Sequence, residues 1–232
     1  MQIEVVDFVS GAQAARGVTV VIDVFRAFSV ACYAYAGGVA KMIPIADIEA
    51  ARALKRAHPE YMTIGERHGR RLEGFDFGNS PTDIQNADLR GKTLVHTTHA
   101  GTQGLTNASQ ADAVLTGSLV NAGAICSYIT ALAPARVSIV RMGQAATERC
   151  AEDDLCADLL VARLKGELFD VSTVRDRLRS APAAQKFFDP AADWAPETDF
   201  ELCTEVDRFG FVLRLRKPEQ GLAYLEQITV QG

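Results

Sequence analysis

Acidic side chains follow several apolar runs of this sequence, at points where a buried strand would reach the protein surface. Asp23 follows the apolar run 18–22, Asp76 lies in a long glycine-rich loop predicted for 65–81, and three acids open a helical segment at 152–154. Carboxylate oxygens, together with water and substrate phosphate, are the ligands that Mg²⁺ prefers. The alternative for 152–154 is a favourable interaction with the helix dipole. We predict a Mg²⁺ site with ligands from Asp23, Asp76, Glu152 and Asp153.

Arginine and a further acid stand close to these carboxylates in the sequence. Arg26 comes three residues after Asp23, and Glu66 and Arg67 follow the apolar segment 61–64. Arginine can bind a phosphate or sulfonate group through two parallel hydrogen bonds. A structural ion pair at the start of a helix is the alternative for Asp23 and Arg26. The predicted catalytic residues are Asp23, Arg26, Glu66, Arg67 and Asp76.

Two turns have the composition of phosphate-binding loops. Residues 78–81 are typical of a helix start whose free N–H groups face outward. The hydroxyl-rich turn 97–102 joins a strand to a helix and lacks the lysine of a Walker A motif. We expect His96 and His99 to be ordinary polar residues rather than ligands. The predicted substrate-binding residues are Asn79, Ser80, Thr97, Thr98, Gly101 and Thr102.

The composition is that of a folded, mildly acidic protein. The chain has 232 residues, a formal net charge of −5 and 48% hydrophobic residues, which excludes a disordered or coiled-coil chain. The acidic balance argues against a nucleic-acid partner, and no apolar run reaches the roughly 18–20 residues of a membrane span. The first residues lack a signal-peptide pattern, so we expect a cytoplasmic protein without a membrane partner. Five cysteines without a C-x-x-C pair argue against a zinc knuckle.

Strand-like and helix-like segments alternate from the strand predicted for 3–9 onward, which is typical of α/β proteins. The last two strands, 209–215 and 224–230, can pair antiparallel, so we predict a layered α/β/α fold with a mixed β-sheet. Residues 1–232 are expected to form a single α/β domain, with two intertwined subdomains as an alternative. Active sites of such folds gather at the carboxyl ends of strands, where the polar clusters fall. The aromatic stretch within 181–205 predicts a helical lid or arm that could cover a second copy in a homodimer.

Five motifs occur in an order that resembles the 2-phosphosulfolactate phosphatase family over about residues 3–165. They are VVIDVFRA at 20–27, GER at 65–67, GFDFGNSP at 74–81, TTHAGT at 97–102 and EDDLCA at 152–157. The resemblance implies a Mg²⁺-dependent phosphatase with a mixed α/β sheet. The namesake reaction releases phosphate from 2-phosphosulfolactate to give sulfolactate, a step of coenzyme M synthesis. His99 and Ala100 depart from the family's usual Thr-Thr-Asn-Gly-Thr motif, and such departures concern specificity more than the metal site.

The resemblance also implies roles for the predicted residues. Mg²⁺ would polarise the phosphoryl oxygens of a small anionic phosphorylated substrate. Arg26, Arg67 and the turn 98–102 would neutralise charge on the transferring group. A carboxylate would either act as the nucleophile or position water, and Asp23 is the first choice for this role.

Two other functions are left open by the sequence. A non-catalytic protein that binds small phosphorylated or sulfonated anions would use the same glycine turns and arginines. A metal-independent histidine phosphatase would use the tripeptide Arg67-His68-Gly69. Dependence on Mg²⁺ separates the second alternative from the main prediction. A haloacid-dehalogenase phosphatase is excluded because its Asp-x-Asp motif would need an acid at position 25, which is Phe25.

Overall fold

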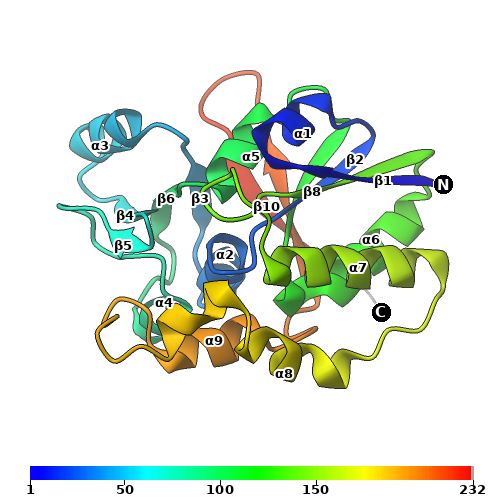
Figure 1. Ribbon diagram of the computed structural model, residues 1–232. Coiled ribbons are helices and arrows are strands. Elements are labelled where there is room, and N and C mark those ends of the chain that lie inside the picture. Colours follow the sequence, from blue (N-terminus) through cyan, green and yellow to red (C-terminus); the bar gives the residue numbers. More distant parts are fainter. Residues whose placement is uncertain (231–232) are drawn as a thin grey trace.

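Helices and strands alternate through residues 1–230, the part of the chain that the computed structural model describes (Figure 1). The strands are β1 (Gln2–Asp7), β2 (Val18–Ile22), β3 (Lys41–Pro44), β4 (Met62–Arg67), β5 (Arg70–Arg71), β6 (Thr93–Thr97), β7 (Ala113–Gly117), β8 (Arg136–Arg141), β9 (Phe211–Arg216) and β10 (Tyr224–Thr229). The helices are α1 (Phe8–Ala14), α2 (Ala27–Ala36), α3 (Ile48–Ala57), α4 (Pro81–Asn86), α5 (Gly101–Asn107), α6 (Ala122–Leu132), α7 (Ala151–Lys165), α8 (Val174–Arg179) and α9 (Glu197–Cys203). Short 3₁₀ helices are η1 (Leu119–Asn121), η2 (Val171–Thr173) and η3 (Pro182–Phe187). None of the helices in residues 1–230 has both the length and the apolar character needed to cross a bilayer.

One mixed sheet runs through the described residues, in the order β1-β8-β2-β7-β9-β10-β3-β6-β4-β5. Strands β1, β8, β2 and β7 are parallel neighbours and form what we call the first half. Strands β3, β6 and β4 are also parallel and form the second half. The antiparallel hairpin β9–β10 lies between the halves and pairs with β7 and β3. The predicted layered α/β fold with a mixed sheet is therefore confirmed, whereas the division into subdomains stays a prediction.

The two halves run in opposite directions within the sheet, because three antiparallel pairings separate β7 from β3. Adjacent strands rotate by about 20–25° relative to each other, so the steps from β2 to β6 accumulate a twist of about 100–125°. This rotation turns the carboxyl ends of the second half toward those of the first. In Figure 1, β3, β4 and β6 lie on one side of α2, and β1, β2 and β8 lie on the other.

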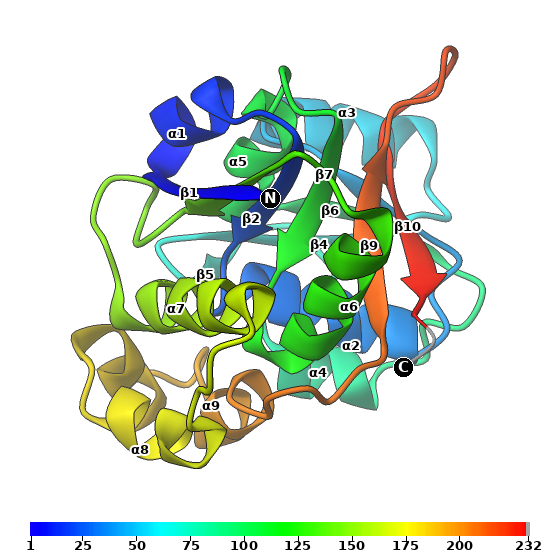
Figure 2. The same ribbon diagram turned by 90° about the vertical axis from the view of Figure 1, so that its right-hand side faces the viewer.

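Strand β2 shows why the first half needs a helical layer on each face. All of its residues are buried, and they alternate between two cores. Val21 belongs to the core formed with α1, α2 and α5, whereas Val20 and Ile22 belong to the core formed with α6 and α7. Successive side chains of a strand point to opposite faces, so a wholly buried strand requires cover on both. Figure 2 shows α1 and α5 above β2, and α6 and α7 below it.

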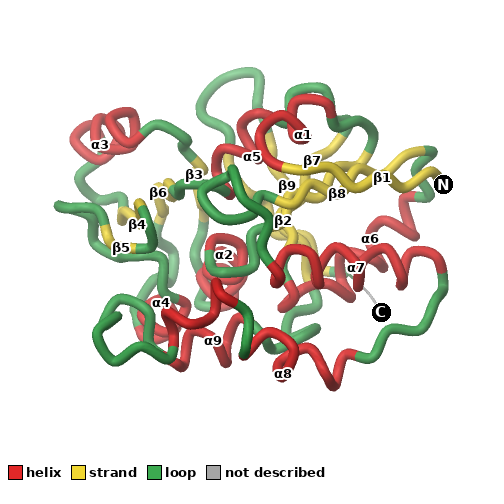
Figure 3. The backbone as a smooth tube through the Cα atoms, in the orientation of Figure 1, coloured by secondary structure: helices red, strands yellow, loops and turns green. Residues whose placement is uncertain are grey.

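Residues 181–205, which we call the arm, are largely helical as predicted and pack against their own chain (Figure 3). Phe187 and Phe200 are 3% and 0% exposed. The ring of Phe25 lies 5.1 Å from that of Phe187 in a T-shaped contact and 5.9 Å from that of Phe200. These aromatic rings complete the core on the α7 side of the sheet. Because the rings of Phe187 and Phe200 are buried within their own chain, they give no support to a homodimer, which stays a prediction.

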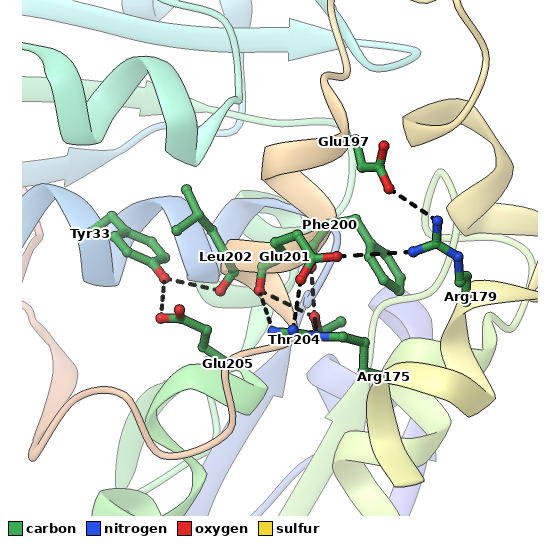
Figure 4. Close-up of polar contacts among 9 residues, drawn as sticks. All are labelled: Tyr33, Arg175, Arg179, Glu197, Phe200, Glu201, Leu202, Thr204 and Glu205. Atoms are coloured by element: carbon green, nitrogen blue, oxygen red, sulfur yellow. Dashed lines mark hydrogen bonds and ion pairs between the residues drawn. The ribbon is translucent and has the colours of Figure 1, made fainter. Parts of the chain in front are cut away.

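Polar contacts fasten the arm to α2 and α8 (Figure 4). The hydroxyl group of Tyr33 in α2 donates a hydrogen bond to the carbonyl oxygen of Leu202 at 3.0 Å. Arg175 of α8 pairs with Glu201 at 2.7 Å. Since α2 begins at Ala27, shortly after Asp23 and Arg26, these contacts hold the arm next to the predicted catalytic residues.

Two element boundaries differ from the prediction. The strand predicted for 3–9 ends at Asp7, and α1 follows it. Gly11 of α1 lies so close to β1 that an added Cβ would stand 3.0 Å from the nearest strand atom. The loop predicted for 65–81 begins later, because β4 continues to Arg67 and forms a hairpin with β5. In the second place, a glycine that suggested a loop instead brings two segments close together, because an added Cβ at Gly65 would lie 2.6 Å from the ring of Phe75.

A buried tyrosine joins the central hairpin to the second half of the sheet. Strands β3 and β10 pair at Met42 and Leu225. The hydroxyl group of Tyr35, from α2, accepts a hydrogen bond from the Met42 N–H at 3.1 Å and donates one to the Leu225 carbonyl oxygen. Burial raises the pKa of Tyr35 to about 12, so the hydroxyl keeps its proton and stays a donor. A side chain of α2 thus supplies part of the pairing between these two strands.

Replacing Tyr35→Phe is expected to lower the free energy of unfolding by about 1–3 kcal/mol, because a buried N–H and a buried carbonyl lose their partner. Urea denaturation measures the change. Tyr224→Phe is the matched control, since the hydroxyl of Tyr224 makes no hydrogen bond within residues 1–230. Equal stability losses in the two variants would contradict the bridging role of Tyr35.

Candidate active site

A cavity of about 330 Å³ lies where the carboxyl ends of the two sheet halves meet. The first half supplies Asp23, which follows β2, and the residues between β8 and α7. The second half supplies the end of β4 and the residues that follow β6. The arm closes the cavity over both. The polar residues that line it are Asp23, Arg26, Glu66, His68, Asn79, His99, Gln144, Glu152, Asp153, Lys186 and Trp194.

Three carboxylates from the first half form one wall of this cavity, which we call the acid wall: Asp23, Glu152 and Asp153. All three are buried. Asp153 accepts hydrogen bonds from the Val24 N–H at 2.9 Å and the Gly143 N–H at 2.8 Å. Asp23 accepts one from the first N–H of α2 at 3.1 Å. The Oε2 atom of Glu152 is buried and has no hydrogen-bond partner within residues 1–230.

Burial and mutual repulsion raise the pKa values of the acid wall. Burial raises the pKa of Asp23 to about 7, and Glu66 adds to the rise. Burial, followed by the charges of Asp23 and Glu152, holds the pKa of Asp153 well above its usual value. Burial likewise raises the pKa of Glu152. A bound cation would relieve this repulsion, and carboxylate oxygens are ligands that a hard divalent metal prefers. Within residues 1–230, however, no three His, Cys, Asp or Glu side chains are grouped so that they could hold a metal ion together.

The ammonium group of Lys186 acts as a counter-ion to the acid wall. No role for this residue was predicted from the sequence. It comes from η3 in the arm and lines the cavity. Burial and the charge of Arg26 lower the pKa of its ammonium group, whereas Glu152 and Asp23 act to raise it. In the sequence, Lys186 is a single lysine near the buried residues Ala184 and Phe187, and it belongs to no motif that would mark it as functional.

Arg26 binds the arm and is held there by several partners. Its guanidinium pairs with Asp199 of α9 at 2.6 Å, and both side chains are buried. It also donates to the carbonyl oxygens of Trp194 at 2.8 Å and Gly69 at 2.9 Å. The ion pair that was the alternative for Asp23 and Arg26 is therefore made with Asp199 instead, 173 residues away in the sequence. Arg26 still lines the cavity and adds positive charge between its walls.

Glu66 lines the cavity and joins two loops of the second half. Its carboxylate accepts hydrogen bonds from the backbone N–H groups of Gly69 at 2.8 Å and His99 at 2.7 Å. The rings of His68 and His99 meet edge to face with centroids 4.9 Å apart, and both line the cavity. His99 was expected to be an ordinary polar residue, and the structure corrects this by placing it in the cavity. His96 is fully buried in the sheet, and burial lowers its pKa to about 4.

Asp76 lies outside the cavity. Its place in the predicted catalytic and metal-binding sets is therefore corrected. Its carboxylate accepts hydrogen bonds from the N–H of Thr63 at 2.7 Å and the hydroxyl of Thr63 at 2.8 Å, and it pairs with Lys55 at 3.3 Å. Although burial acts to raise the pKa of Asp76, these contacts hold it below its usual value. The contacts pin the loop after β5 against β4.

Arg67 also differs from its predicted role, because it does not line the cavity and its guanidinium forms hydrogen bonds with neighbouring residues instead. Its guanidinium donates to the carbonyl oxygens of Glu66 and Ala46 and to the hydroxyl of Thr97 at 3.2 Å. Ser80 donates to Asp199 at 2.7 Å and caps α4. These contacts stabilise the turns rather than reach the cavity.

The hydroxyl-rich turn is closed on itself. The N–H of Thr98 donates to the hydroxyl of Thr102 at 3.0 Å, and the N–H of Thr102 donates to the hydroxyl of Thr98 at 3.1 Å. An added Cβ at Gly101 would lie 2.8 Å from Oδ2 of Asp23, so glycine lets α5 approach the acid wall. Of the six predicted substrate-binding residues, the cavity lining includes Asn79, whose Oδ1 is buried without a partner within residues 1–230.

Comparison with known proteins agrees with this α/β site. The family model described as 2-phosphosulpholactate phosphatase matches residues 5–218. The chain therefore belongs to this family, and it is a phosphoric monoester hydrolase.

Several curated relatives carry the name "Probable 2-phosphosulfolactate phosphatase". One from Bacillus subtilis is 27% identical over 202 residues, covering 86% of this chain and 87% of the relative. One from Parasynechococcus marenigrum is 35% identical over 174 residues, covering 74% of this chain and 72% of the relative. One from Clostridium perfringens strain SM101 is 28% identical over 238 residues, covering 94% and 95%. The similarity to this last relative extends over nearly the whole chain, the arm included.

The raised pKa of Asp23 predicts how the metal-free protein responds to pH. The carboxyl group of Asp23 binds its proton more tightly in the folded protein than in the unfolded chain. This proton therefore stabilises the fold fully below the ordinary pKa of 3.8, and the stabilisation is lost as the pH rises to about 7. Asn is neutral throughout, so Asp23→Asn should gain thermal stability relative to the wild type across this range. Melting temperatures in EDTA measure the difference, with the exposed Asp158→Asn as control. A difference that does not change with pH would contradict a buried, repelled Asp23.

Asp76→Ala is expected to behave as a stability variant. It removes the contacts with Thr63 and Lys55, which should lower the free energy of unfolding by about 1–3 kcal/mol. Its kcat, measured at a temperature where the variant is folded, should stay close to that of the wild type. A large loss of kcat with an unchanged melting temperature would return Asp76 to the catalytic set.

Proposed function

We propose that this protein is a Mg²⁺-dependent phosphatase that hydrolyses the phosphomonoester of a small 2-hydroxy acid, with 2-phosphosulfolactate as the expected substrate and sulfolactate and phosphate as products. The observation that carries the proposal is the acid wall, three buried carboxylates that follow β2 or belong to α7 and line one cavity together with Lys186. If all three are ionised, Lys186 offsets one of their charges, and a divalent cation would offset the rest.

The donor set fits Mg²⁺ in a specific way. Within residues 1–230, no three His, Cys, Asp or Glu side chains are grouped as a complete metal site. Mg²⁺ is usually held by one or two carboxylates together with water and substrate phosphate, so a complete protein cage is not needed. The unpartnered Oε2 of Glu152 and the backbone-fixed carboxylate of Asp153 would hold the cation. When bound, the cation polarises the phosphoryl oxygens.

The chain's own residues would divide the remaining work. Lys186 lies beside the acid wall and would bind a phosphoryl oxygen through its ammonium group. Asp23 is fixed by the first N–H of α2. Asp23 lines the cavity beside the two residues that would hold the cation, and its burial favours the protonated form of the carboxyl group, so we assign Asp23 the role of accepting a proton from the attacking water. Pro182 and Trp194 of the arm line the cavity together with Phe25, which follows β2, and these apolar groups shield it from bulk water.

The histidine-phosphatase alternative finds no support in this geometry. That chemistry needs Arg67 and His68 together at the phosphate. The guanidinium of Arg67 instead donates to backbone carbonyl groups and to Thr97, outside the cavity lining.

The proposal is tested by phosphate release from 2-phosphosulfolactate after removal of divalent cations with a chelator and re-addition of Mg²⁺. Activity should depend on Mg²⁺. Glu152→Gln should lower kcat by about 100-fold or more, the scale of removing one electrostatic stabiliser. Asp158→Asn, an acid on the exposed face of the same helix, is the matched control and should keep the wild-type rate. Full activity in the chelated enzyme, or in Glu152→Gln, would refute the proposed mechanism.

A further inference from the structure

A second wall of the cavity is formed by residues of the second half of the sheet and of the arm, whereas the acid wall comes from the first half. His68 lies in the β4–β5 turn, His99 follows β6, and Trp194 lies in the arm before α9. All three line the cavity. We call these three residues the aromatic wall. Each of them can offer a ring N–H to a ligand.

Polar atoms of the aromatic wall lack partners in the protein. Nδ1 of His99 and Nε1 of Trp194 are buried and have no hydrogen-bond partner within residues 1–230. A buried polar atom left unpaired costs free energy, so such atoms are uncommon in folded proteins. Both residues line the cavity, so a polar group of a ligand bound there is a candidate partner for these two atoms.

The aromatic wall is held rigidly around Gly69. The N–H of Gly69 donates to the carboxylate of Glu66 at 2.8 Å, and the carbonyl oxygen of Gly69 accepts from the guanidinium of Arg26 at 2.9 Å. Gly69 has a φ of +80°, and an added Cβ would lie 2.3 Å from the Trp194 ring. Glu66 also binds the N–H of His99. Glu66 is therefore a positioning residue, because it fixes the turn beside His68 and the loop of His99 at once.

Electrostatics separate the two walls. The acid wall repels any anionic group that is not shielded by a cation or by Lys186. Two guanidinium groups flank the aromatic wall, those of Arg26 and Arg70, which lie 5.4 and 5.5 Å from the Trp194 ring. Asp199 pairs with Arg26, and the carboxylate of Glu66 is held by two backbone N–H groups, so Arg70 is the cation beside Trp194 for which the described residues show no ion pair. A substrate with a second anionic group would place that group on the aromatic wall and its phosphate at the acid wall.

We propose that His68, His99 and Trp194 form the subsite for a second anionic group of the substrate, a carboxylate or a sulfonate, and so determine the preference for phosphorylated acids over simple phosphate esters. This inference rests on the proposed function for the identity of the substrate. His99 stands where the sequence departs from the usual family motif, so the subsite is a property of this chain's own residues.

Three phosphate esters of secondary alcohols test the subsite with the full-length protein and Mg²⁺. 2-Phosphosulfolactate carries a carboxylate and a sulfonate, 2-phospholactate carries a carboxylate alone, and glycerol 2-phosphate carries neither. His99→Ala and Trp194→Phe should each lower the preference for 2-phosphosulfolactate over glycerol 2-phosphate, as the ratio of kcat/KM values, by about ten-fold or more, mainly through KM. Trp194→Phe keeps a ring against Gly69 and removes the N–H. His58→Ala, an exposed imidazole stacked on Tyr61 outside the cavity, is the control.

The outcomes separate the alternatives. If the preference for 2-phospholactate falls as well, the subsite binds the carboxylate, and if it does not, the subsite binds the sulfonate. An unchanged ratio, or an equal loss on all three esters, would overturn the inference, because the residues would then act on the phosphoryl or leaving group or not at all.

Binding of sulfolactate, measured by calorimetry, gives a readout that does not require turnover. His99→Ala should weaken it by about ten-fold, and an affinity equal to that of the wild type would overturn the inference. The proposed function fails separately, if the wild type releases phosphate from none of the three esters.

Discussion

The burial of several carboxylates in one small cavity is the constraint around which this structure is arranged. Asp23, Glu152 and Asp153 lose most of their hydration and repel one another, which is why their pKa values rise. A fold retains such a cluster when backbone N–H groups, a counter-ion or a bound cation offset the cost. The chain provides the first through β2 and the loop before α7, and the second through Lys186. The repulsion that remains unbalanced is what a divalent cation would remove.

The arm follows from the same constraint. Lys186 lines the same cavity as the acid wall because residues 181–205 fold back over the carboxyl ends of the strands. The pair of Arg26 and Asp199 holds the arm there with both charges buried, so it depends on accurate geometry rather than on proximity alone. Arg26 was expected to bind phosphate directly. Its partners show that it also acts through the arm, by fixing the segment that carries Lys186 and Trp194.

Much of the fold and part of the site could be predicted from the sequence. The alternation of strand-like and helix-like segments predicted the mixed α/β sheet, and the acids at 152–154 lie in the first turn of α7, as expected. Asp23 was predicted because an acid that follows a buried strand has to lie at the edge of the sheet, and Glu152 and Asp153 were predicted because three consecutive acids open a helix. Lys186 and Trp194 were missed because their roles arise from contacts with residues far away in the chain, which no local spacing encodes.

Asp76 and the paired threonines show the opposite error. Their types and spacing suit phosphate or metal binding, yet Thr63 takes up the carboxylate, and Thr98 and Thr102 take up each other. Local pattern gives the donors and acceptors that a turn contains. It does not say whether the turn itself uses them.

The position of the β9–β10 hairpin has a consequence for how the protein assembles on the ribosome. These strands follow all the others described along the chain, yet they lie in the middle of the sheet. Each half can begin to form while the chain is still being synthesised, but β7 and β3 keep exposed edges until the hairpin emerges and fills the gap. Exposed strand edges invite pairing with other chains. The nascent protein is therefore most vulnerable to aggregation just before its last strands are made, and its active site comes together as one of the final events of folding.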